Sequence, residues 1–341
     1  MRDPLRVAVI GAGRIGTLHA ELLAHGIAGA ALAAIHDLRP AAAKAAAARL
    51  GVPAASSVDA LLADPGVDAV AICSSTDTHA DLIVRAAEAG KAVFCEKPVS
   101  LDLETMDRAL DAVAAAGVAF QIGFNRRFDA AHASVRLAVQ SGEIGTPHLV
   151  RITSRDPAPP PREYLAGSGG MFLDMSIHDF DMARYVTGSE VVEVFARGAA
   201  RVDPAIAEFG DIDTALITLV HEDGCLTVID NSRCAVYGYD QRVEAFGSGG
   251  VATSDNPLVH TGLVRKRSGT RTAELPTFFL DRYLASYRAE WEGFVCALRA
   301  GQAPPVGPED ARAPLVIGLA AGRSLHEERA VPVAEIEAAP A

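Results

Sequence analysis

The sequence contains few features of a secreted, membrane-spanning or nucleic-acid-binding protein. No apolar run reaches the roughly 18 residues that cross a bilayer, and no secretory signal precedes the first glycine motif. A net charge of −12 lacks the basic surplus that binds nucleic acids or anionic membranes. The cysteines show no paired spacing, which favours buried, reduced thiols: Cys73, Cys95, Cys225, Cys234 and Cys296. We therefore expect a cytoplasmic protein.

The length of 341 residues predicts two domains, and the character of the sequence changes near residue 123. In residues 1–123, short apolar runs alternate with alanine-rich helical stretches, which predicts an α/β fold with a parallel, doubly wound Rossmann sheet. The expected strands are residues 5–10, 31–37, 67–75, 91–98 and 118–124. The expected helices are residues 14–26, 39–51, 57–66, 78–90 and 103–117.

Residues 124–341 predict a second, α+β domain with a large, mainly antiparallel open sheet. Strands are expected at residues 147–155 and 191–202, and hairpins at residues 213–233 and 263–275, turning at Glu222–Gly224 and Ser268–Gly269. A Pro- and Gly-rich loop interrupts the sheet and leads to a helix from Met175. Two further helices, at residues 283–301 and 308–328, close the chain.

The stretch "GAGRIG" fits the phosphate-binding pattern G-x-G-x-x-G between a strand and a helix. Gly11 permits a tight turn, Gly13 lets the backbone approach a pyrophosphate, and Gly16 lets the helix pack closely on the strand. Arg14 and Ile15 complete the loop, where a helix N-terminus presents N–H groups to anionic oxygens. The motif therefore predicts a dinucleotide site.

Asp37 stands 21 positions after Gly16, at the end of the second expected strand. Its carboxylate is suited to accept hydrogen bonds from an adenosine ribose and to repel a 2′-phosphate, which favours NAD over NADP. Arg39 leaves room for use of both cofactors. The alternative for Asp37 is a plain surface turn.

"VFCEKPVS" places Glu96, Lys97 and Pro98 at the carboxyl end of a later strand, where open α/β sheets bind ligands. The proline stiffens the connection beside the expected nicotinamide. Lysine is scarce here, with only four against 27 arginines, so this one is informative. Its ammonium is suited to hydrogen-bond a substrate hydroxyl and to stabilise developing alkoxide charge. The alternative is a surface lysine at a strand end.

"SSTDTHA" begins at the carboxyl end of the expected strand over residues 67–75. Ser74, Ser75 and His79 are therefore candidates to contact the cofactor's ribose or nicotinamide. For His79, a residue that merely begins a helix is an equal alternative.

"GGMFLDMSIHDFDMARY" places Asp174 and His178 one helical turn apart. A helix from Met175 would make Asp174 its N-cap and leave His178 on a similar face. Imidazole titrates near neutrality and a carboxylate stabilises its charged form, so the pair is suited to take a proton from an alcohol. Two alternatives remain: an ordinary capped helix with a satisfied histidine, and a metal site that would also use Asp179 or Asp181.

Together, "GAGRIG", "FCEKP", "GFNRRFD" and "DMSIHDFD" resemble the glucose–fructose oxidoreductase/inositol dehydrogenase family of nicotinamide-dependent enzymes, and the resemblance runs from Arg6 to about Glu328. It implies a Rossmann domain followed by an α/β domain whose open sheet forms an oligomer interface, hence a homotetramer or dimer.

The resemblance also implies roles for single residues. It implies that Lys97 contacts the reacting hydroxyl, and that Asp174 and His178 form the acid–imidazole pair with His178 as the base. The substrate contacts that it implies are Lys97, Arg126, Asp156, Asp174, His178 and one of Tyr237 and Tyr239, two tyrosines that alternate on an expected strand and otherwise simply pack.

Two departures lie among the substrate-binding residues. Asn125 stands where methionine is expected, and Arg155–Asp156 stands where Arg–Asn is common. These two departures bear on which substrate is bound rather than on which reaction is catalysed.

The implied activity is NAD-dependent oxidation of a secondary alcohol on a cyclic polyol, myo-inositol to 2-keto-myo-inositol (scyllo-inosose), with no metal. The alternatives are another cyclitol, an aldose such as glucose, or a non-catalytic nucleotide-binding regulator, because a Rossmann fold does not by itself imply turnover.

Overall fold

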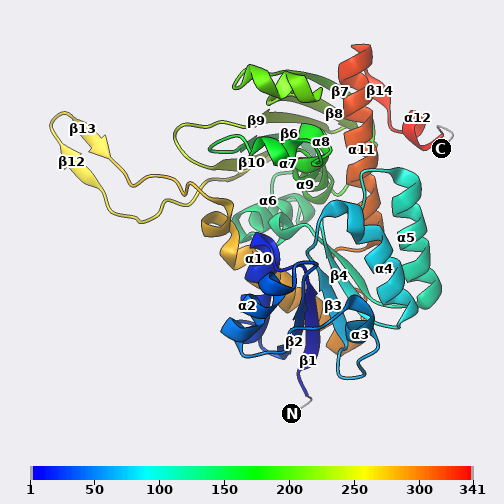
Figure 1. Ribbon diagram of the computed structural model, residues 1–341. Helices are drawn as coiled ribbons and strands as arrows, with labels where there is room; N and C mark the ends of the chain where they lie inside the picture. Colours follow the sequence, from blue (N-terminus) through cyan, green and yellow to red (C-terminus); the bar gives the residue numbers. More distant parts are fainter. Residues whose placement is uncertain (1–2, 339–341) are drawn as a thin grey trace. The chain divides into compact units, whose positions relative to one another are not determined.

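A computed structural model describes residues 3–338, which form two compact units (Figure 1). The first unit extends to Asn125 and also includes Tyr287–Ala313. The second unit comprises Arg126–Ser286 and the described residues from Pro314 onward. The chain therefore returns to the first unit after Ser286.

The first unit contains the predicted parallel sheet, in the order β2-β1-β3-β4-β5. Its strands are β1 Leu5–Ile10, β2 Ala30–His36, β3 Ala69–Ile72, β4 Ala92–Glu96 and β5 Phe120–Gly123. The connecting helices are α1 Arg14–His25, α2 Pro40–Leu50, α3 Val58–Leu62, α4 His79–Glu88 and α5 Leu103–Ala116, with a short 3₁₀ turn η1 at Thr76–Thr78. Each predicted strand and helix of this part is present.

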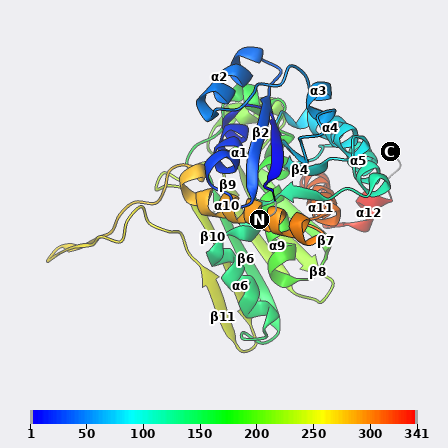
Figure 2. The same cartoon turned by 90° about the horizontal axis from the view of Figure 1, so that it is seen from below.

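The strand order makes the sheet doubly wound. The chain moves outward from β1 to β2 and then crosses back to β3, β4 and β5. Because crossovers between parallel strands are right-handed, this reversal puts α1 on the opposite face from α4 and α5 (Figure 2). The central strands are covered on both sides, which explains why β3 is fully buried and continuously apolar.

Local signals set the helix ends in this unit. The Ser57 hydroxyl accepts a hydrogen bond from the Ala60 N–H, and Asp102 accepts one from the Thr105 N–H at 2.7 Å. α2 and α5 end at Gly51 and Gly117, which adopt left-handed backbone angles that favour glycine. The sequence positions of these caps therefore fix where each helix begins and ends.

The returning segment completes the core of the first unit. It is the second half of α10 (Phe279–Ala300), and its fully buried Trp291 stacks on Phe94 with ring centroids 4.4 Å apart. The thiols of Cys73, Cys95 and Cys225 are buried, as expected, whereas Cys234 is only partly buried and Cys296 on α10 is exposed.

The second unit is built on a seven-stranded sheet in the order β11-β10-β6-β9-β8-β7-β14. β6 and β9 pair in parallel and the other neighbours are antiparallel, so the predicted mainly antiparallel sheet is confirmed. The strands are β6 Pro147–Arg155, β7 Val191–Ala199, β8 Thr214–His221, β9 Leu226–Ser232, β10 Asp240–Gly247, β11 Gly250–Ser254 and β14 Val331–Pro332. Both predicted hairpins are present, the second as β12 Val264–Lys266 and β13 Gly269–Arg271.

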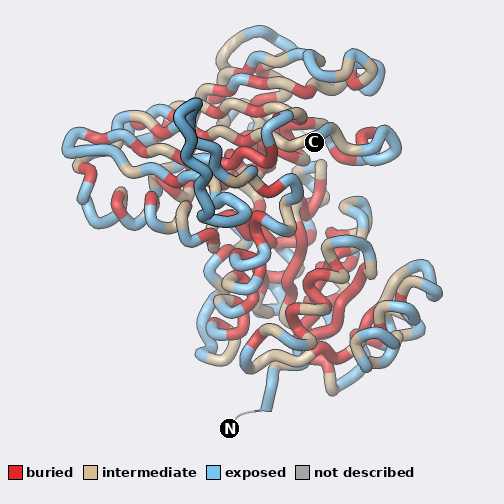
Figure 3. Tube along the Cα trace, turned by 90° about the vertical axis from the view of Figure 1, so that its left-hand side faces the viewer, coloured by how far each residue is buried: buried red, intermediate tan, exposed pale blue. Residues whose placement is uncertain are grey.

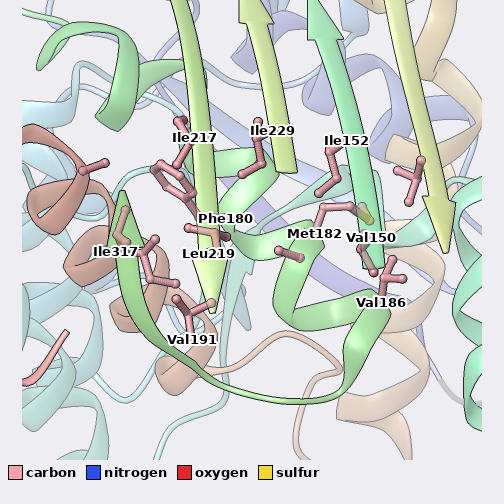
Figure 4. Packing of buried hydrophobic residues seen from close by; sticks show 14 of the residues in the cluster. Val150, Ile152, Phe180, Met182, Val186, Val191, Ile217, Leu219, Ile229 and Ile317 are labelled. Carbon is pink, nitrogen blue, oxygen red and sulfur yellow. The ribbon is translucent and has the colours of Figure 1, made fainter. Parts of the chain in front are cut away.

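Helices cover one face of this sheet. They are α6 Ala130–Gln140, α7 Arg162–Leu165, α8 Gly170–Asp174, α9 Ile177–Thr187, α11 Pro308–Glu327 and α12 Ala334–Glu337, with 3₁₀ turns η2 Asn125–Phe128 and η3 Pro204–Phe209. Alternate strand residues such as Ile152, Ile217 and Ile229 pack against Phe180 and Met182 of α9 (Figure 4). No expected helix corresponds to α6.

The opposite face of the sheet carries exposed apolar side chains. Leu216, Leu226, Phe246 and Val251 are each more than two-fifths exposed, on strands whose other face is buried (Figure 3). Exposed apolar side chains that gather on one face commonly mark a protein–protein interface. Among residues 3–338, no helix is long and apolar enough to cross a membrane.

Two local predictions in this unit are wrong. The helix expected from Met175 is present as α9, which begins at Ile177, but a separate short helix, α8, precedes it, so Asp174 ends α8 and does not cap α9. Tyr237 and Tyr239 do not lie on a strand; they precede β10, in a turn where Gly238 has a φ of 124°. Glycine permits this turn and gives the two tyrosines different surroundings.

Candidate functional site

In the first unit, the glycines of the phosphate loop are required by packing. A Cβ on Gly11, whose φ is 103°, would lie 2.5 Å from the Cys73 carbonyl oxygen. A Cβ on Gly16 would lie 1.9 Å from the Gly11 carbonyl oxygen, so α1 approaches the loop more closely than any side chain allows. A Cβ on Gly13 would meet no atom within 4 Å. Gly13 thus borders open space at the N-terminus of α1, the arrangement that receives a pyrophosphate.

Asp37 is held rigidly at the end of β2. Its carboxylate accepts hydrogen bonds from the Ala12 N–H at 2.7 Å and from the Arg39 N–H at 2.8 Å. Partial burial would raise the pKa of Asp37, but these two bonds outweigh it and lower the pKa. The Asp37 carboxylate is therefore ionised, adjoins the glycine loop and suits a ribose diol. The Arg39 side chain is largely exposed, and its Nε lies 3.4 Å from that carboxylate.

His79 ties together the loops that follow β3 and β4. Its Nδ1 lies 2.8 Å from the Pro98 carbonyl oxygen and its Nε2 lies 3.1 Å from the Ser74 carbonyl oxygen. The ring is buried, which lowers the pKa of His79. Ser74 in turn bonds the Thr78 hydroxyl at 2.6 Å, while Ser75 precedes the turn η1. His79 therefore fixes the two loops that carry the candidate cofactor residues.

Glu96 is anchored by residues that the sequence analysis did not select. The Trp291 indole N–H donates to Nδ1 of His19 at 2.8 Å, so the His19 proton is on Nε2. That N–H donates to the Glu96 carboxylate at 2.7 Å, and all three side chains are buried. The chain of bonds fixes the end of β4 just before Lys97. Nothing in the sequence pattern connects these three positions.

The candidate residues of the first unit thus gather at one edge. Gly11 to Gly16 follow β1, Asp37 and Arg39 follow β2, Ser74 to His79 follow β3, and Glu96 and Lys97 follow β4. The carboxyl ends of parallel strands meet at a single edge of the sheet, where such folds bind their ligands.

In the second unit, Asp174 belongs to a charged cluster. Its carboxylate accepts a hydrogen bond from the Tyr164 hydroxyl at 2.7 Å and lies 3.3 Å from Nη1 of the buried Arg233. Burial, followed by the charge of Asp174, raises the pKa of Tyr164. Arg233 also approaches Asp211, at 3.7 Å. The carboxylate of Asp174 is therefore held by a hydrogen bond and by a buried cation.

His178 is the second residue of α9, and its neighbours on both sides are fastened to the sheet. Ser176 donates to the Asn231 side-chain oxygen at 2.5 Å, and Asn231 donates to Asp179 at 2.8 Å. Asn231 lies on the inner face of β9. The start of α9 thus has one position relative to the sheet, and the partly buried His178 lies within it.

Arg126 forms a buried ion pair with Asp179. Its Nη1 donates to the Asp179 carboxylate at 2.7 Å and to the Ser154 hydroxyl at 3.2 Å. Burial raises the pKa of Asp179, although Arg126 and Asn231 oppose the rise. Much of the Arg126 guanidinium is therefore engaged in holding α9, and its predicted contact with substrate remains a prediction.

Asp156, Tyr239 and Tyr283 surround Arg126. Burial raises the pKa of Asp156 to about 6, because the nearby Arg126 and Arg233 only partly offset it. The buried Tyr239 meets Tyr283 edge to face at 6.0 Å.

Tyr237 lies apart from these residues. It is half exposed, and its hydroxyl donates to Asp240 at 2.7 Å. Of the two predicted tyrosines, only Tyr239 joins the polar cluster.

The side-chain partners of Asp179 and Asp181 do not support a metal site. Asp179 is paired with Arg126, and Asp181 binds Arg127 through two nitrogens at 2.6–3.1 Å. Over residues 3–338, no group of three or more His, Cys, Asp or Glu side chains is placed to hold a metal ion. What the cluster offers instead is a set of carboxylates, arginines and tyrosines that can hydrogen-bond several hydroxyls.

Comparison with known proteins identifies the class. Residues 5–124 match the "Oxidoreductase family, NAD-binding Rossmann fold", so the glycine loop and Asp37 belong to an NAD-binding oxidoreductase. Residues 132–253 match the "GFO/IDH/MocA C-terminal domain". The chain belongs to the GFO/IDH/MocA oxidoreductase family, which confirms the resemblance found in the sequence.

Individual relatives are similar over nearly their whole length. The chain is 49% identical to myo-inositol 2-dehydrogenase of Thermotoga maritima, covering 97% of this chain and 99% of that one. It is 43% identical to inositol 2-dehydrogenase of Rhizobium meliloti, over 97% and 99%. The crystal structure of Lactobacillus casei scyllo-inositol dehydrogenase with bound NAD(H) and scyllo-inositol has a TM-score of 0.90 at 30% identity, covering 97% of this chain and 100% of that one.

Gly16 and Gly13 of the phosphate loop are expected to respond differently to substitution by alanine. Gly16→Ala is expected to cost about 1–3 kcal/mol of the free energy of unfolding, because its Cβ overlaps the Gly11 backbone. Gly13→Ala is expected to leave stability within about 0.5 kcal/mol, because its φ of −74° is ordinary and its Cβ meets nothing. Gly13→Ala should instead weaken NAD binding by about tenfold, because the methyl occupies the space that a pyrophosphate needs. Urea unfolding and NAD titration of both variants separate these effects; equal loss of stability in both would contradict this reading.

Proposed function

We propose that this chain is an NAD-dependent dehydrogenase that oxidises a secondary alcohol of a cyclic polyol, with myo-inositol converted to 2-keto-myo-inositol (scyllo-inosose). The observation that carries the proposal is the 49% identity to a myo-inositol 2-dehydrogenase over nearly the full length of both chains. The polar cluster around Asp156, Asp174 and Arg126 supports a substrate rich in hydroxyls.

We assign the roles within this reaction as follows. When bound, NAD supplies the hydride acceptor. Lys97 donates a hydrogen bond to the reacting hydroxyl and stabilises its developing negative charge. A ring nitrogen of His178 accepts the hydroxyl proton, and Asp174, ionised beside Arg233, stabilises the protonated imidazole by its charge. Gly11 to Gly16, Asp37, Arg39, Ser74, Ser75, His79 and Glu96 serve the cofactor. Arg126, Asp156 and one of the two tyrosines are the further substrate contacts; Tyr239, which joins the polar cluster, is favoured over Tyr237.

The same proposal covers the domains, the assembly and the location. Residues 1–123 bind NAD, and residues 124–341 bind substrate and form the oligomer interface. The exposed apolar face of the seven-stranded sheet supports a homotetramer or homodimer. We expect the enzyme to act in the cytoplasm, which the scattered, unpaired cysteines favour.

A spectrophotometric screen for NADH tests the activity. We expect turnover with NAD and myo-inositol, and much less with NADP, because Asp37 repels a 2′-phosphate. scyllo-Inositol is the second candidate substrate, since the Lactobacillus casei enzyme of the same fold is named for it. Turnover with glucose alone would move the assignment to an aldose, and no turnover with any cyclitol or aldose would favour a nucleotide-binding regulator.

The raised pKa of Asp156 predicts that kcat/KM for the polyol depends on pH. Its pKa of about 6 means that the carboxyl is protonated below that pH and becomes a stronger hydrogen-bond acceptor above it. The kcat/KM for the polyol should therefore rise by about tenfold as pH increases through 6, the value of one charged hydrogen bond. Asp156→Asn should abolish this inflection, whereas Asp255→Asn, an exposed control, should keep it. An unchanged inflection in Asp156→Asn would assign it to another group.

A further inference from the structure

An arm of residues 255–278 projects from the second unit between β11 and α10 (Figure 1). Every residue from 257 to 272 is exposed, and β12 and β13 pair only with each other within the described sheets. A two-stranded hairpin is at best marginally stable in water, and this one has no core of its own. The exposed large apolar side chains along the arm are Leu258, Val259, Leu263, Val264 and Phe278.

The base of the arm is firmly fastened. On the outgoing side, the Asn256 side chain accepts a hydrogen bond from the Gln241 N–H at 2.8 Å and donates one to Asp240 at 2.6 Å. On the returning side, the Pro276 carbonyl accepts a bond from the Tyr239 N–H at 2.8 Å. The two sides are joined by the Val259 N–H and the Glu274 carbonyl at 3.1 Å. The arm is therefore presented in a fixed direction, which lowers the entropic cost of docking it.

The tip of the arm is strongly basic. Arg265, Lys266, Arg267 and Arg271 lie within eight residues that include no acid, and all four are exposed. The whole chain has a net charge of −12, so everything outside the tip is more acidic still. The tip thus complements the charge of the chain that carries it.

We propose that the arm docks on a second copy of this chain, with its basic tip against an acidic surface of that copy and its apolar side chains covered by it. Charge complementarity favours this partner, because the tip is basic whereas the rest of each copy of the chain is acidic. The inference rests on the proposed homo-oligomer and adds a contact separate from the apolar face of the sheet.

The direct test is a cross-link between copies. The photoreactive residue p-benzoylphenylalanine replaces Arg267 in the full chain, and ¹⁴N- and ¹⁵N-labelled copies are mixed, equilibrated and irradiated. We expect mixed-isotope cross-links from the tip to an acidic segment of the other copy. A separate measurement must show that the labelled copies exchange. Given that exchange, the proposal would be overturned if all cross-links joined segments of one isotope, or if none formed.

A charge-reversal variant tests the energetics. The quadruple variant Arg265→Glu/Lys266→Glu/Arg267→Glu/Arg271→Glu is expected to weaken self-association by about tenfold, the sum of several exposed ion pairs. Added salt, which should weaken association of the wild type, should strengthen that of this variant, because an acidic tip is repelled by an acidic surface. A control with the same charge change replaces four exposed cations elsewhere by glutamate: Lys44, Arg49, Arg108 and Arg201. The control should associate almost normally. A second variant with glutamine at the four tip positions guards against loss of folding and should show an intermediate effect.

Sedimentation equilibrium then separates the possible results. An oligomer that is equally stable in wild type and in both tip variants would overturn the arm contact and leave the proposed homo-oligomer intact. A wild type that is monomeric at all concentrations would overturn both. A tip-specific, salt-dependent loss of association supports the arm.

Discussion

His178→Ala is expected to lower kcat by about 10²–10⁴-fold, the usual contribution of a positioned general base. Without the imidazole, the hydroxyl proton loses its acceptor, and an ordinary carboxylate is a much weaker base than imidazole. NAD affinity should be unchanged, because His178 lies in the second unit and the glycine loop lies in the first. Initial rates with saturating myo-inositol and a separate NAD titration measure the two quantities.

Two controls distinguish a missing base from a damaged fold. His148→Ala removes an exposed histidine from β6 and should retain full activity. Added imidazole should restore part of the activity of His178→Ala but not that of Lys97→Met, which lacks a hydrogen-bond donor rather than a proton acceptor. Wild-type turnover in His178→Ala would remove this residue from the mechanism.

The first unit was largely predictable from the sequence, because its signals are local. Continuous apolar runs mark buried parallel strands, and glycines or capping residues mark the helix ends. The glycine loop and Asp37 are separated by one strand–helix–strand unit, so their spacing alone brings them together. The same holds for Lys97, whose place at a strand end follows from the order of the elements.

The cluster of the second unit was not predictable in the same way, because its contacts join positions that are distant in the sequence. Asp179 is held by Arg126 and Asn231, 53 and 52 residues away. A D-x-x-x-H spacing suggested one helix, yet Ser176 bonds to β9 at the point where α8 ends and α9 begins. Asp179 was considered only as a possible metal ligand, and no local pattern shows that an arginine neutralises it.

Arg126→Met is expected to lower the free energy of unfolding by about 3–5 kcal/mol, the largest loss of stability among these variants. Methionine fills a similar volume but leaves Asp179, fully buried, without its cation. Asp179→Asn added to Arg126→Met should recover much of the loss, because no buried charge is then left unpaired. Arg151→Met is the matched control: its pair with Glu244 is exposed and should contribute less than about 1 kcal/mol.

The loss of stability in Arg126→Met should also depend on pH, and the direction of that dependence follows from the protonation of Asp179. The pKa of Asp179 is already raised in the folded protein, and loss of Arg126 removes one of the groups that hold it down. The folded variant then binds a proton more tightly than the unfolded chain, so its stability falls as pH rises from the unfolded value toward the folded one. Urea unfolding should therefore show a small deficit at mildly acidic pH and a larger one at neutral pH, while the double variant shows no such trend. A deficit that is constant across this range would mean that the methionine disrupts packing and that Asp179 does not depend on Arg126 for its charge.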